Sequence, residues 1–398
     1  KTNMAEWNNT HLSEVLVDKG YIRGPFGSAL KRCDMKDNGI PVYEQQHAIY
    51  NSRYFRYYID EQKFNEMKRF QVNTDDLIIS CSGTVGKVSI IRSDDPKGII
   101  SQALLILRVD QKKILPLYLK YFFTSRDGYN AIVSRSSGSV QVNIAKRNVI
   151  EQIPLMLPKI EIQRKIVEIL NSIDNKIEEN EEINNNLEQQ AKALYKDWFF
   201  DFSPFSSDGN LPNGWHIGTV GDIIQLHDSK RVPLSGAERD KMAKVYPYYG
   251  ATSLMDYVDN YLFDGIYLLL GEDGTVVDSL GFPILQYVYG QFWVNNHTHI
   301  ITGKEGFSVE ELYLFFSLTN IKSIVTGAVQ QKVSQQNLKK VPAIIPSKQA
   351  LSAFDEIIQP IFAQIRNLRD ENVNLSQLRD TLLPKLMSGE LDVSDIDL

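Results

Sequence analysis

The sequence is poor in the residues on which several classes of protein depend. It has two cysteines, Cys33 and Cys81, and their spacing fits no metal site, so neither a disulfide framework nor a cysteine-bound metal is expected. It contains no apolar run of transmembrane length and no basic leader followed by an apolar stretch. These absences predict a cytoplasmic protein that does not bind membranes.

Motifs of nucleic-acid enzymes are also missing. No Pro-Pro pair occurs, which excludes the Asn/Asp-Pro-Pro-aromatic loop that holds a flipped base in amino-methyltransferases, and no Gly-x-Gly follows an expected strand. Residues 83–87 (Gly-Thr-Val-Gly-Lys) are too short for a phosphate loop, and Val88 stands where Ser or Thr would hold magnesium, so this stretch predicts a turn. Asp95 and Lys97 match a nuclease pattern only by chance spacing. The sequence predicts no catalytic residues and no cofactor.

Histidine offers one pair with a metal-like spacing. His297 and His299 would lie on the same side of a strand, but the sequence offers no evident third ligand. A structural or hydrogen-bonding role is therefore predicted for them, and no metal site.

What the chain does contain is a duplicated unit. Gly138-Ser-Val140-Gln141 leads to Pro154 and Pro158, and Gly327-Ala-Val329-Gln330 leads in the same way to Pro342 and Pro346. The separation is 189 residues at the glycines and 188 at the prolines, and it stays at 188 along the segment that follows. Further landmarks recur in order: residues 41–43 match 247–249, and residues 83–85 match 274–276. The repeat predicts a pseudo-twofold molecule that binds a partner at two places.

Composition and patterning predict two α+β domains. A chain of 398 residues with 43% hydrophobic residues can form two or three ordinary cores. Each half opens with short apolar runs between Gly and Asp turns, which indicates strands, for example at residues 76–80, 87–91, 103–107 and 265–270. The predicted segments are a globular domain at 1–157, a helix at 158–200, a second globular domain at 201–345 and a second helix at 346–398.

Each domain is followed by a heptad pattern. Apolar residues step by three and four, which is typical of a coiled-coil seam. An antiparallel pairing of the two helices would separate the globular domains. The expected seam comprises Leu170, Ile173, Ile177, Leu187 and Leu194 in the first helix and Ile358, Ile361, Ile365, Leu375 and Leu382 in the second, with Asn180, Asn184 and Asn372 able to fix its register.

Charge differs between these segments. The net charge of the chain is -6, yet residues 1–157 hold 22 Lys and Arg against 16 Asp and Glu. Residues 158–210 and 346–398 are acidic, and the second domain is weakly acidic. A basic domain beside acidic helices suits one face on phosphate and another on a protein.

These features together resemble the specificity subunit of Type I restriction-modification systems. The resemblance rests on residues 138–166 at the junction of domain and helix, and on Tyr246-Pro-Tyr-Tyr-Gly-Ala-Thr252, Gly271-Glu-Asp-Gly274 and Phe292-Trp-Val-Asn-Asn-His297 in the second domain. It also rests on the C-terminal stretch 378–391, and it covers essentially the whole chain. The aromatic residues 198–202 that end the first helix depart from the pattern of the second.

The resemblance implies a non-catalytic reader of double-stranded DNA. Each target-recognition domain would recognise one half of a split asymmetric sequence, and the two helices would span the unread gap. The helices would also dock methyltransferase subunits, with a restriction subunit joining through them. A duplicated reader on a helical spacer predicts a bipartite site on physical grounds as well, because half-site separation follows protein dimensions.

Residues shared by the two copies are expected to be scaffold, because readers of different targets share a frame and differ where they recognise DNA. Gly138, Val140, Gly327 and Val329 are therefore predicted turn and core residues. Arginine, lysine, tyrosine and glutamine are expected to supply the phosphate and base contacts, and the repeated Gln141 and Gln330 stay among the candidates because glutamine can bond adenine edges bidentately. The candidates are Lys31, Arg32, Tyr50, Arg53, Arg56, Lys68, Arg69, Arg135, Gln141 and Lys146 in the first domain and Lys230, Arg231, Lys244, Gln330, Gln331 and Lys332 in the second.

Two other function classes stay open at the sequence level. The acidic helices also fit a coiled-coil scaffold that binds only proteins, and an orphan methyltransferase system could use the same kind of reader. Salt-dependent affinity for duplex DNA would separate the reader from the scaffold.

Overall fold

A computed structural model describes residues 7–26, 29–136, 142–206, 208–327 and 330–396. The chain divides into two compact units, one formed by residues 1–178 and 372–398 and the other by residues 179–371. Below these are called unit 1 and unit 2. The division falls inside two 40-residue helices, α6 (Ile160–Phe199) and α11 (Lys348–Met387), so each unit holds a segment of both.

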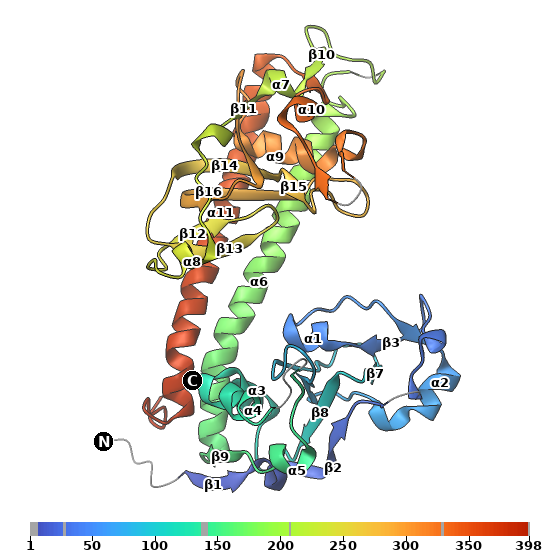
Figure 1. The fold of residues 1–398 in the computed structure, drawn as a ribbon, viewed down its shortest axis with the longest axis vertical. Coiled ribbons are helices and arrows are strands. Elements are labelled where there is room, and N and C mark those ends of the chain that lie inside the picture. Colours follow the sequence, from blue (N-terminus) through green and yellow to red (C-terminus); the bar gives the residue numbers. More distant parts are fainter. Residues whose placement is uncertain (1–6, 27–28, 137–141, 207, 328–329, 397–398) are drawn as a thin grey trace. The chain divides into compact units, whose positions relative to one another are not determined.

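Unit 1 is built on two small sheets and a strand pair. The four-stranded sheet has the order β2-β8-β5-β6, the three-stranded sheet has the order β4-β3-β7, and β1 pairs with β9. Short helices connect and cover them (Figure 1). The elements are β1 (Asn8–His11), β2 (Leu16–Arg23), β3 (Ile40–Tyr43), α1 (Gln45–Ile49), β4 (Tyr58–Ile59), α2 (Glu61–Glu66), β5 (Leu77–Ser80), β6 (Val88–Ile90), β7 (Ile99–Ile100), β8 (Leu104–Val109), α3 (Pro116–Thr124), α4 (Arg126–Val133), α5 (Arg147–Ile150) and β9 (Pro154–Leu157).

Unit 2 carries a six-stranded sheet with the order β11-β17-β14-β16-β12-β13 and the strand pairs β10-β19 and β15-β18. The elements are β10 (His216–Thr219), α7 (Val220–Ile223), β11 (Ile224–Leu226), α8 (Gly236–Arg239), β12 (Tyr246–Tyr249), β13 (Leu254–Val258), β14 (Phe263–Gly271), β15 (Asp273–Gly274), β16 (Leu285–Val294), β17 (Thr298–Gly303), α9 (Val309–Leu318), β18 (Gln331–Lys332), α10 (Gln335–Leu338) and β19 (Pro342–Ile345). The predicted α+β class is confirmed.

The internal repeat is visible in the strand register. Asn8 pairs with Leu157 in unit 1, and His216 pairs with Ile345 in unit 2, with the same antiparallel order along both strand pairs. The landmark strands β3 and β12 each make one parallel pairing, Val42 with Ile99 and Tyr248 with Trp293. Both copies therefore share one topology, as the repeated motifs predicted.

One difference between the copies explains their different sheets. In unit 1 the strands β6 and β7 are separate, and eight residues lie between them. In unit 2 the ten-residue strand β16 pairs with β14 along most of its length and with β12 at its end. The continuous strand joins the two sheets into one.

Local signals set the ends of several elements. The helix α9 begins with a capping box in which the Ser308 hydroxyl accepts from the Glu311 amide and the Glu311 carboxylate accepts from the Ser308 amide. Residues 83–87 form the turn predicted for them, with Gly83 and Gly86 at positive φ between β5 and β6. Gly327 also has positive φ, and an added Cβ would lie 2.1 Å from the Gln330 carbonyl oxygen, so this glycine is required by the turn.

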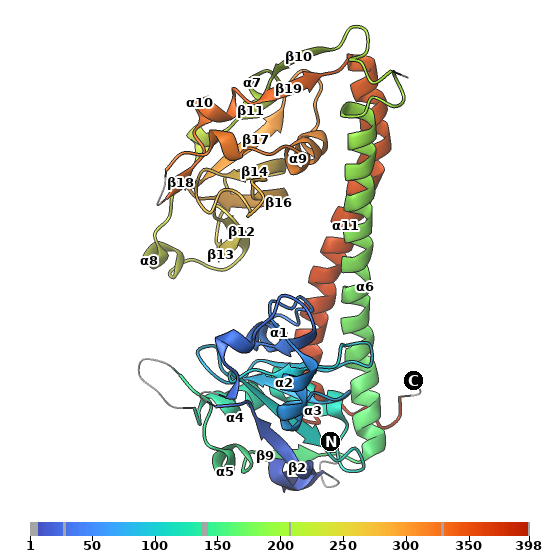
Figure 2. The ribbon, with the colours of Figure 1, turned by 90° about the vertical axis from the view of Figure 1, so that its right-hand side faces the viewer.

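In each unit a segment of α6 lies beside a segment of α11 in antiparallel direction (Figures 1 and 2). In unit 1 the side-chain amide of Asn372 donates to the Ile177 carbonyl at 3.2 Å, and Arg379 pairs with Asp174 at 3.1 Å. In unit 2 the side-chain amide of Asn180 donates to the Glu371 carboxylate at 2.9 Å. Two of the three predicted seam asparagines thus bond across the helix pair.

Burial along the predicted seam is uneven. Leu170, Ile173, Ile358 and Ile365 are buried, whereas the other predicted members are half-buried, namely Ile177, Leu187, Leu194, Ile361, Leu375 and Leu382. At its C-terminal end α6 packs against more than one element, so Tyr195 and Phe199 are the buried residues there and Leu194 is not.

The aromatic end of α6 has a structural cause. Tyr195, Trp198 and Phe199 surround Phe354 of α11 at ring-centroid distances of 4.9 to 5.6 Å. Trp215 packs on Phe199 at 5.7 Å. The departure from the second helix's pattern is therefore an aromatic cluster that fixes α6 within unit 2.

Of the helices in the described ranges, none combines the length and the apolar character that crossing a bilayer requires.

Candidate nucleic-acid interface

The segment between α1 and β4 carries three of the residues predicted to contact DNA, Tyr50, Arg53 and Arg56. Arg53 lies in it, but its guanidinium faces the protein: Nε pairs with Asp95 Oδ1 at 2.5 Å and Nη2 donates to the Ile90 carbonyl at 3.3 Å. The Asp95 side chain is only 4% exposed. Arg53 therefore ties this segment to the loop that holds Asp95.

The neighbouring residues of this segment point outward. Tyr50 is 78% exposed and Tyr54 is 72% exposed. Arg56 is 59% exposed, pairs with Glu44 at 2.7 Å and lies 4.6 Å from the Tyr57 ring centroid. The hydrogen bond that Arg56 donates to Glu44 raises the pKa of Arg56, so this guanidinium stays charged. Two tyrosines and one arginine are thus presented together to solvent.

A second group of cations lies around a small apolar cluster of unit 1. Lys31 and Arg32 begin the short helix η4 (Arg32–Asp34), and Lys68 and Arg69 lie in η5 (Lys68–Phe70). The flanking residues Leu30, Met35 and Phe70 belong to the same apolar cluster. All four cations are exposed, and none has an ion-pair partner within the described ranges. They are free to contact an anion.

The last predicted residues of unit 1 are dispersed. Arg135 is half-buried and donates to the Ala131 carbonyl at 2.8 Å, so it closes the end of α4. Lys146 is exposed at the start of α5. Gln141, with Gly138 and Val140, lies outside the described residues, as does Val329 in the second copy.

In unit 2, Arg231 occupies an internal position. It is 16% exposed, and its Nη1 donates to Glu272 at 2.6 Å, to the Thr298 carbonyl at 2.8 Å and to the Asn296 carbonyl at 3.2 Å. Arg23 does the same in unit 1, where Nη1 donates to the carbonyls of Gln102 and Leu104 at 2.9 Å.

The two arginines are equivalents in the repeat, because both follow the paired N-terminal strand by the same distance. Arg231 therefore belongs to the shared scaffold. Sequence reasoning missed this because Arg23 lies 208 positions earlier, whereas the recognised motifs lie 188 to 206 positions apart. An alignment started at Trp7 and Trp215, which are also 208 positions apart, would have revealed it.

The other predicted cations of unit 2 differ in whether they form ion pairs within the protein. Lys230 is exposed and has no ion-pair partner among the residues with described positions. Lys244 pairs with Asp256 at 2.9 Å, and Arg239 pairs with the same carboxylate at 3.1 Å. Among the described side chains, no contact connects Lys244 with Lys230.

Gln330, Gln331 and Lys332 lie together at a tight turn. The backbone groups of Thr326 and Lys332 exchange two hydrogen bonds, at 2.9 and 2.7 Å, and β18 pairs with β15. Gln330 is exposed and Gln331 is half-buried. Lys332 reaches Glu272 at 3.5 Å, and Arg231 reaches the same carboxylate.

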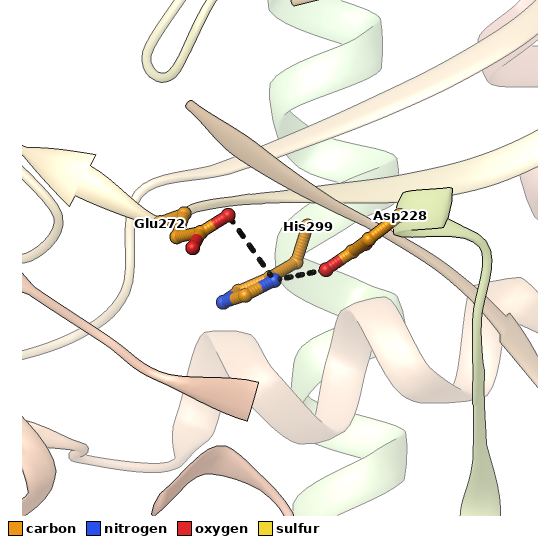
Figure 3. A group of neighbouring side chains, drawn as sticks. All are labelled: Asp228, Glu272 and His299. Carbon is orange, nitrogen blue, oxygen red and sulfur yellow. Dashed lines mark hydrogen bonds and ion pairs between the residues drawn. The ribbon is translucent and has the colours of Figure 1, made fainter. Parts of the chain in front are cut away.

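His297 and His299 do not converge on a common ligand. His297 is half-exposed and pairs with Asp273 at 2.6 Å, whereas His299 is fully buried and faces Asp228 at 2.7 Å. Asp228, Glu272 and His299 nevertheless form a group whose ligand atoms lie within 4.8 Å (Figure 3). The sequence did not reveal that Asp228 and Glu272 lie beside His299, because Asp228 lies 71 positions before His299.

This group is poorly suited to a metal ion. Glu272 is already bonded to Arg231, and Asp228 accepts from Gln335 at 2.5 Å and from the Ile300 amide at 2.9 Å. A divalent ion would have to displace these donors and lie beside the Arg231 guanidinium. The expectation that the two histidines have a hydrogen-bonding role agrees with the geometry.

One exposed pair of cations was not predicted. Lys87, in the turn between β5 and β6, lies 4.7 Å from the Tyr129 ring centroid. Together with Arg126 of α4 it lines a hollow in unit 1 of about 300 Å³. Only the Lys87 position carried a sequence signal, and that signal indicated a turn.

Comparison with known proteins agrees with this architecture. A model of the family described as Type I restriction modification DNA specificity domain matches residues 5–189 and 212–376. The MjaIX specificity subunit of Methanocaldococcus jannaschii is 26% identical, and the match covers 70% of each chain. The HindI specificity subunit of Haemophilus influenzae is 22% identical, with 77% of this chain and 84% of that one covered.

A solved structure has the same fold. The crystal structure of the Type I restriction-modification S subunit from M. genitalium superposes with a TM-score of 0.55 at 15% identity, and the match covers 96% of both chains.

Proposed function

The chain belongs to the Type I restriction modification DNA specificity family, and from this premise we propose that it selects the DNA target of a restriction-modification complex. Each unit reads one half of a split asymmetric sequence. The helices α6 and α11 span the unread gap and dock methyltransferase subunits, through which a restriction subunit joins. Methyl transfer and cleavage belong to these partners, and the chain itself acts in the cytoplasm without catalytic activity.

The observation that carries the proposal is the duplicated frame with different surfaces. Equivalent strand pairs and the equivalent arginines Arg23 and Arg231 recur in both units. The outer segments differ: unit 1 has the exposed segment around Tyr50 and Tyr54, whereas unit 2 has the hairpin β12-β13 at the same place in the topology. A shared frame with two different surfaces suits two different half-sites.

The proposed interface consists of the exposed predicted residues and the half-buried Gln331. Exposed cations anchor phosphates, and tyrosine and glutamine side chains supply further contacts. In unit 1 these are Lys31, Arg32, Tyr50, Arg56, Lys68, Arg69 and Lys146, and in unit 2 they are Lys230, Lys244, Gln330, Gln331 and Lys332. Arg53, Arg135 and Arg231 are assigned to holding their loops, because their guanidinium groups are engaged within the protein.

Methylation-sensitive genome sequencing tests the function. Cells that express the chain with a methyltransferase subunit should carry methylation at two short defined blocks around an unread gap. The pattern should disappear when the chain is omitted. Unchanged methylation, with the methyltransferase shown to be bound, would contradict the proposal.

A protein-only scaffold is the second candidate, and the acidic segment 158–210, with 6 Lys and Arg against 11 Asp and Glu, favours it. Titration of a duplex at several salt concentrations separates the two. A reader that neutralises several phosphates loses affinity steeply with salt, whereas a scaffold has no duplex affinity to lose.

A further inference from the structure

Unit 2 contains a buried charged group around His299 of β17 (Figure 3). The imidazole is fully buried. Its Nδ1 lies 2.7 Å from Asp228 Oδ2 and 3.9 Å from Glu272 Oε2, and its Nε2 lies 2.8 Å from the Val333 carbonyl oxygen.

Both ring nitrogens of His299 face hydrogen-bond acceptors. The Val333 carbonyl only accepts, and the Asp228 carboxylate also accepts from Gln335 and from the Ile300 amide. Burial raises the pKa of Asp228, but the hydrogen bond from His299 and the other donors outweigh it, and the pKa is lowered overall. Asp228 is therefore ionised. A neutral imidazole has one N–H, so two acceptors require the doubly protonated ring.

The charges around the ring are compatible with an imidazolium. Asp228 and Glu272 are the carboxylates that face it, and Arg231 and Lys332 are the cations on Glu272, at 2.6 and 3.5 Å. A proton on Nδ1 lies between His299 and Asp228. A divalent metal would need the Nδ1 lone pair and would add two charges beside Arg231.

The group holds the segment that follows the candidate DNA contacts Gln330, Gln331 and Lys332. The Val333 amide donates to the Glu272 carbonyl at 2.8 Å, while the Val333 carbonyl accepts from His299. Two residues further on, Gln335 donates to Asp228. The C-terminal side of the turn is thus fixed by both backbone groups of one residue and by one side chain.

Unit 1 lacks this group at the equivalent positions. Strand register aligns Leu105 with His299 and Cys81 with Glu272, and the residue that pairs opposite Leu105 is Arg23 and not a carboxylate. The backbone contact is kept, because the Ile144 amide donates to the Cys81 carbonyl at 2.9 Å. Leucine cannot donate to the Ile144 carbonyl, so among the described residues this charged interaction occurs in unit 2 and not at the equivalent place in unit 1.

We propose that His299, as an imidazolium between Asp228 and the Val333 carbonyl, is a positioning residue for the half-site that unit 2 reads. It acts through Val333 on the adjacent Gln330, Gln331 and Lys332. The inference rests on the proposed function, and it makes recognition of one half-site dependent on a fully buried residue behind the candidate DNA contacts.

Selection from a library of randomised duplexes tests the inference with the full chain. The wild type, His299→Gln and the control His297→Gln are each bound to the library, and the bound duplexes are sequenced. His297 is the matched control because it is half-exposed and lies two residues away in the sequence. His299→Gln should lower the enrichment of one block by about tenfold, as expected for a lost charged hydrogen bond, and leave the other block unchanged.

The comparison of the two blocks separates positioning from a merely structural role, because a general loss of folding would weaken both. Two blocks that His299→Gln leaves unaltered would overturn the inference alone. Absence of any bipartite selection by the wild type would overturn the proposed function and the inference with it.

A spectroscopic measurement covers the case in which the variant does not fold. The ¹⁵N shifts of the His299 ring in the wild type should be those of an imidazolium at pH 6 and should not respond to added zinc. Shifts of a neutral ring at pH 6, or a change on adding zinc, would contradict the assignment.

Discussion

Arg23 and Arg231 show what the repeat does at the scale of single residues. Each donates to one carbonyl group before a central strand and to the carbonyl group of its first residue, so both guanidinium groups are engaged within the protein. Arg53 is similar, because its partner Asp95 is almost fully buried. An arginine in a basic region is therefore assigned to recognition or to scaffold by its partner and not by its charge.

Arg53 and Arg56 should respond differently to substitution. Arg53→Ala leaves the buried Asp95 carboxylate without its cation and should lower the free energy of unfolding by about 3 kcal/mol. Arg56→Ala removes an exposed pair and should cost less than about 1 kcal/mol, yet weaken duplex affinity. Thermal unfolding and duplex titration of both variants measure the two effects. Equal affinity losses without any change in thermal stability would show that Arg53 contacts DNA directly.

Glu311 should make the stability of the protein depend on pH. It is fully buried, and burial raises its pKa from 4.5 to about 8. Between these values the unfolded chain is ionised at this residue and the folded chain keeps the proton, so stability falls as pH rises, by up to about 1.4 kcal/mol per pH unit.

Glu311→Gln tests this, because glutamine also fits the capping box with Ser308. The variant should flatten the decline in denaturant-unfolding free energy between pH 5 and pH 8. Glu238→Gln is the matched control: Glu238 occupies the same position of the α8 capping box but is exposed, and hydrogen bonds from Ser235 lower its pKa. A decline of unchanged slope in Glu311→Gln would mean that Glu311 is ionised in the folded protein.

At the scale of elements, α6 and α11 owe their stability to more than the heptad seam. In unit 1 the apolar cluster combines Ile166 and Leu170 of α6 with Leu383 and Leu386 of α11 and with the strands of the domain. In unit 2 the aromatic residues around Phe354 join α6 to α11 in the same way. Each helix segment is therefore part of the core of its own unit.

Truncation of one seam residue should destabilise unit 1. Leu170→Ala removes a fully buried side chain and should lower the free energy of unfolding by about 2 to 5 kcal/mol. Leu378→Ala, on α11, is the control because Leu378 is 48% exposed, and it should change stability by no more than about 0.5 kcal/mol. Denaturant titration of both variants gives the comparison. Equal costs would mean that Leu170 is not part of the packed interface.

At the scale of the whole molecule, two diverged copies of one topology are connected by two continuous helices. Each helix has 40 residues and contributes to both units. Because a regular α-helix resists changes in length, the proposed spacer accepts one separation of half-sites and few others.

The length of the unread gap should therefore be part of the target. Once the two blocks are known, duplexes in which the gap is one or two base pairs longer or shorter should bind with affinity near that of a single block. Competition binding against the selected duplex measures this. Full affinity across several gap lengths would show that the units engage their half-sites independently.

The sequence by itself determined the repeat, the α+β class and the two long helices. Motif spacing and heptad periodicity are properties of neighbouring residues, so they survive without any knowledge of packing. The same reasoning found the turns at Gly83 and Gly327 and the exposed cations Lys31, Arg32, Lys68 and Arg69, because each depends on local chemistry.

Only the tertiary structure decided which predicted residues are free to contact DNA. Asp95, Glu272 and Asp228 lie 41 to 71 positions from the groups they pair with, and the sheets bring them together. No local pattern indicates that Arg53 and Arg231 are satisfied inside the protein or that His299 is enclosed by two acceptors. Burial and partner choice come from strand order and register, which set long-range contacts that sequence spacing does not encode.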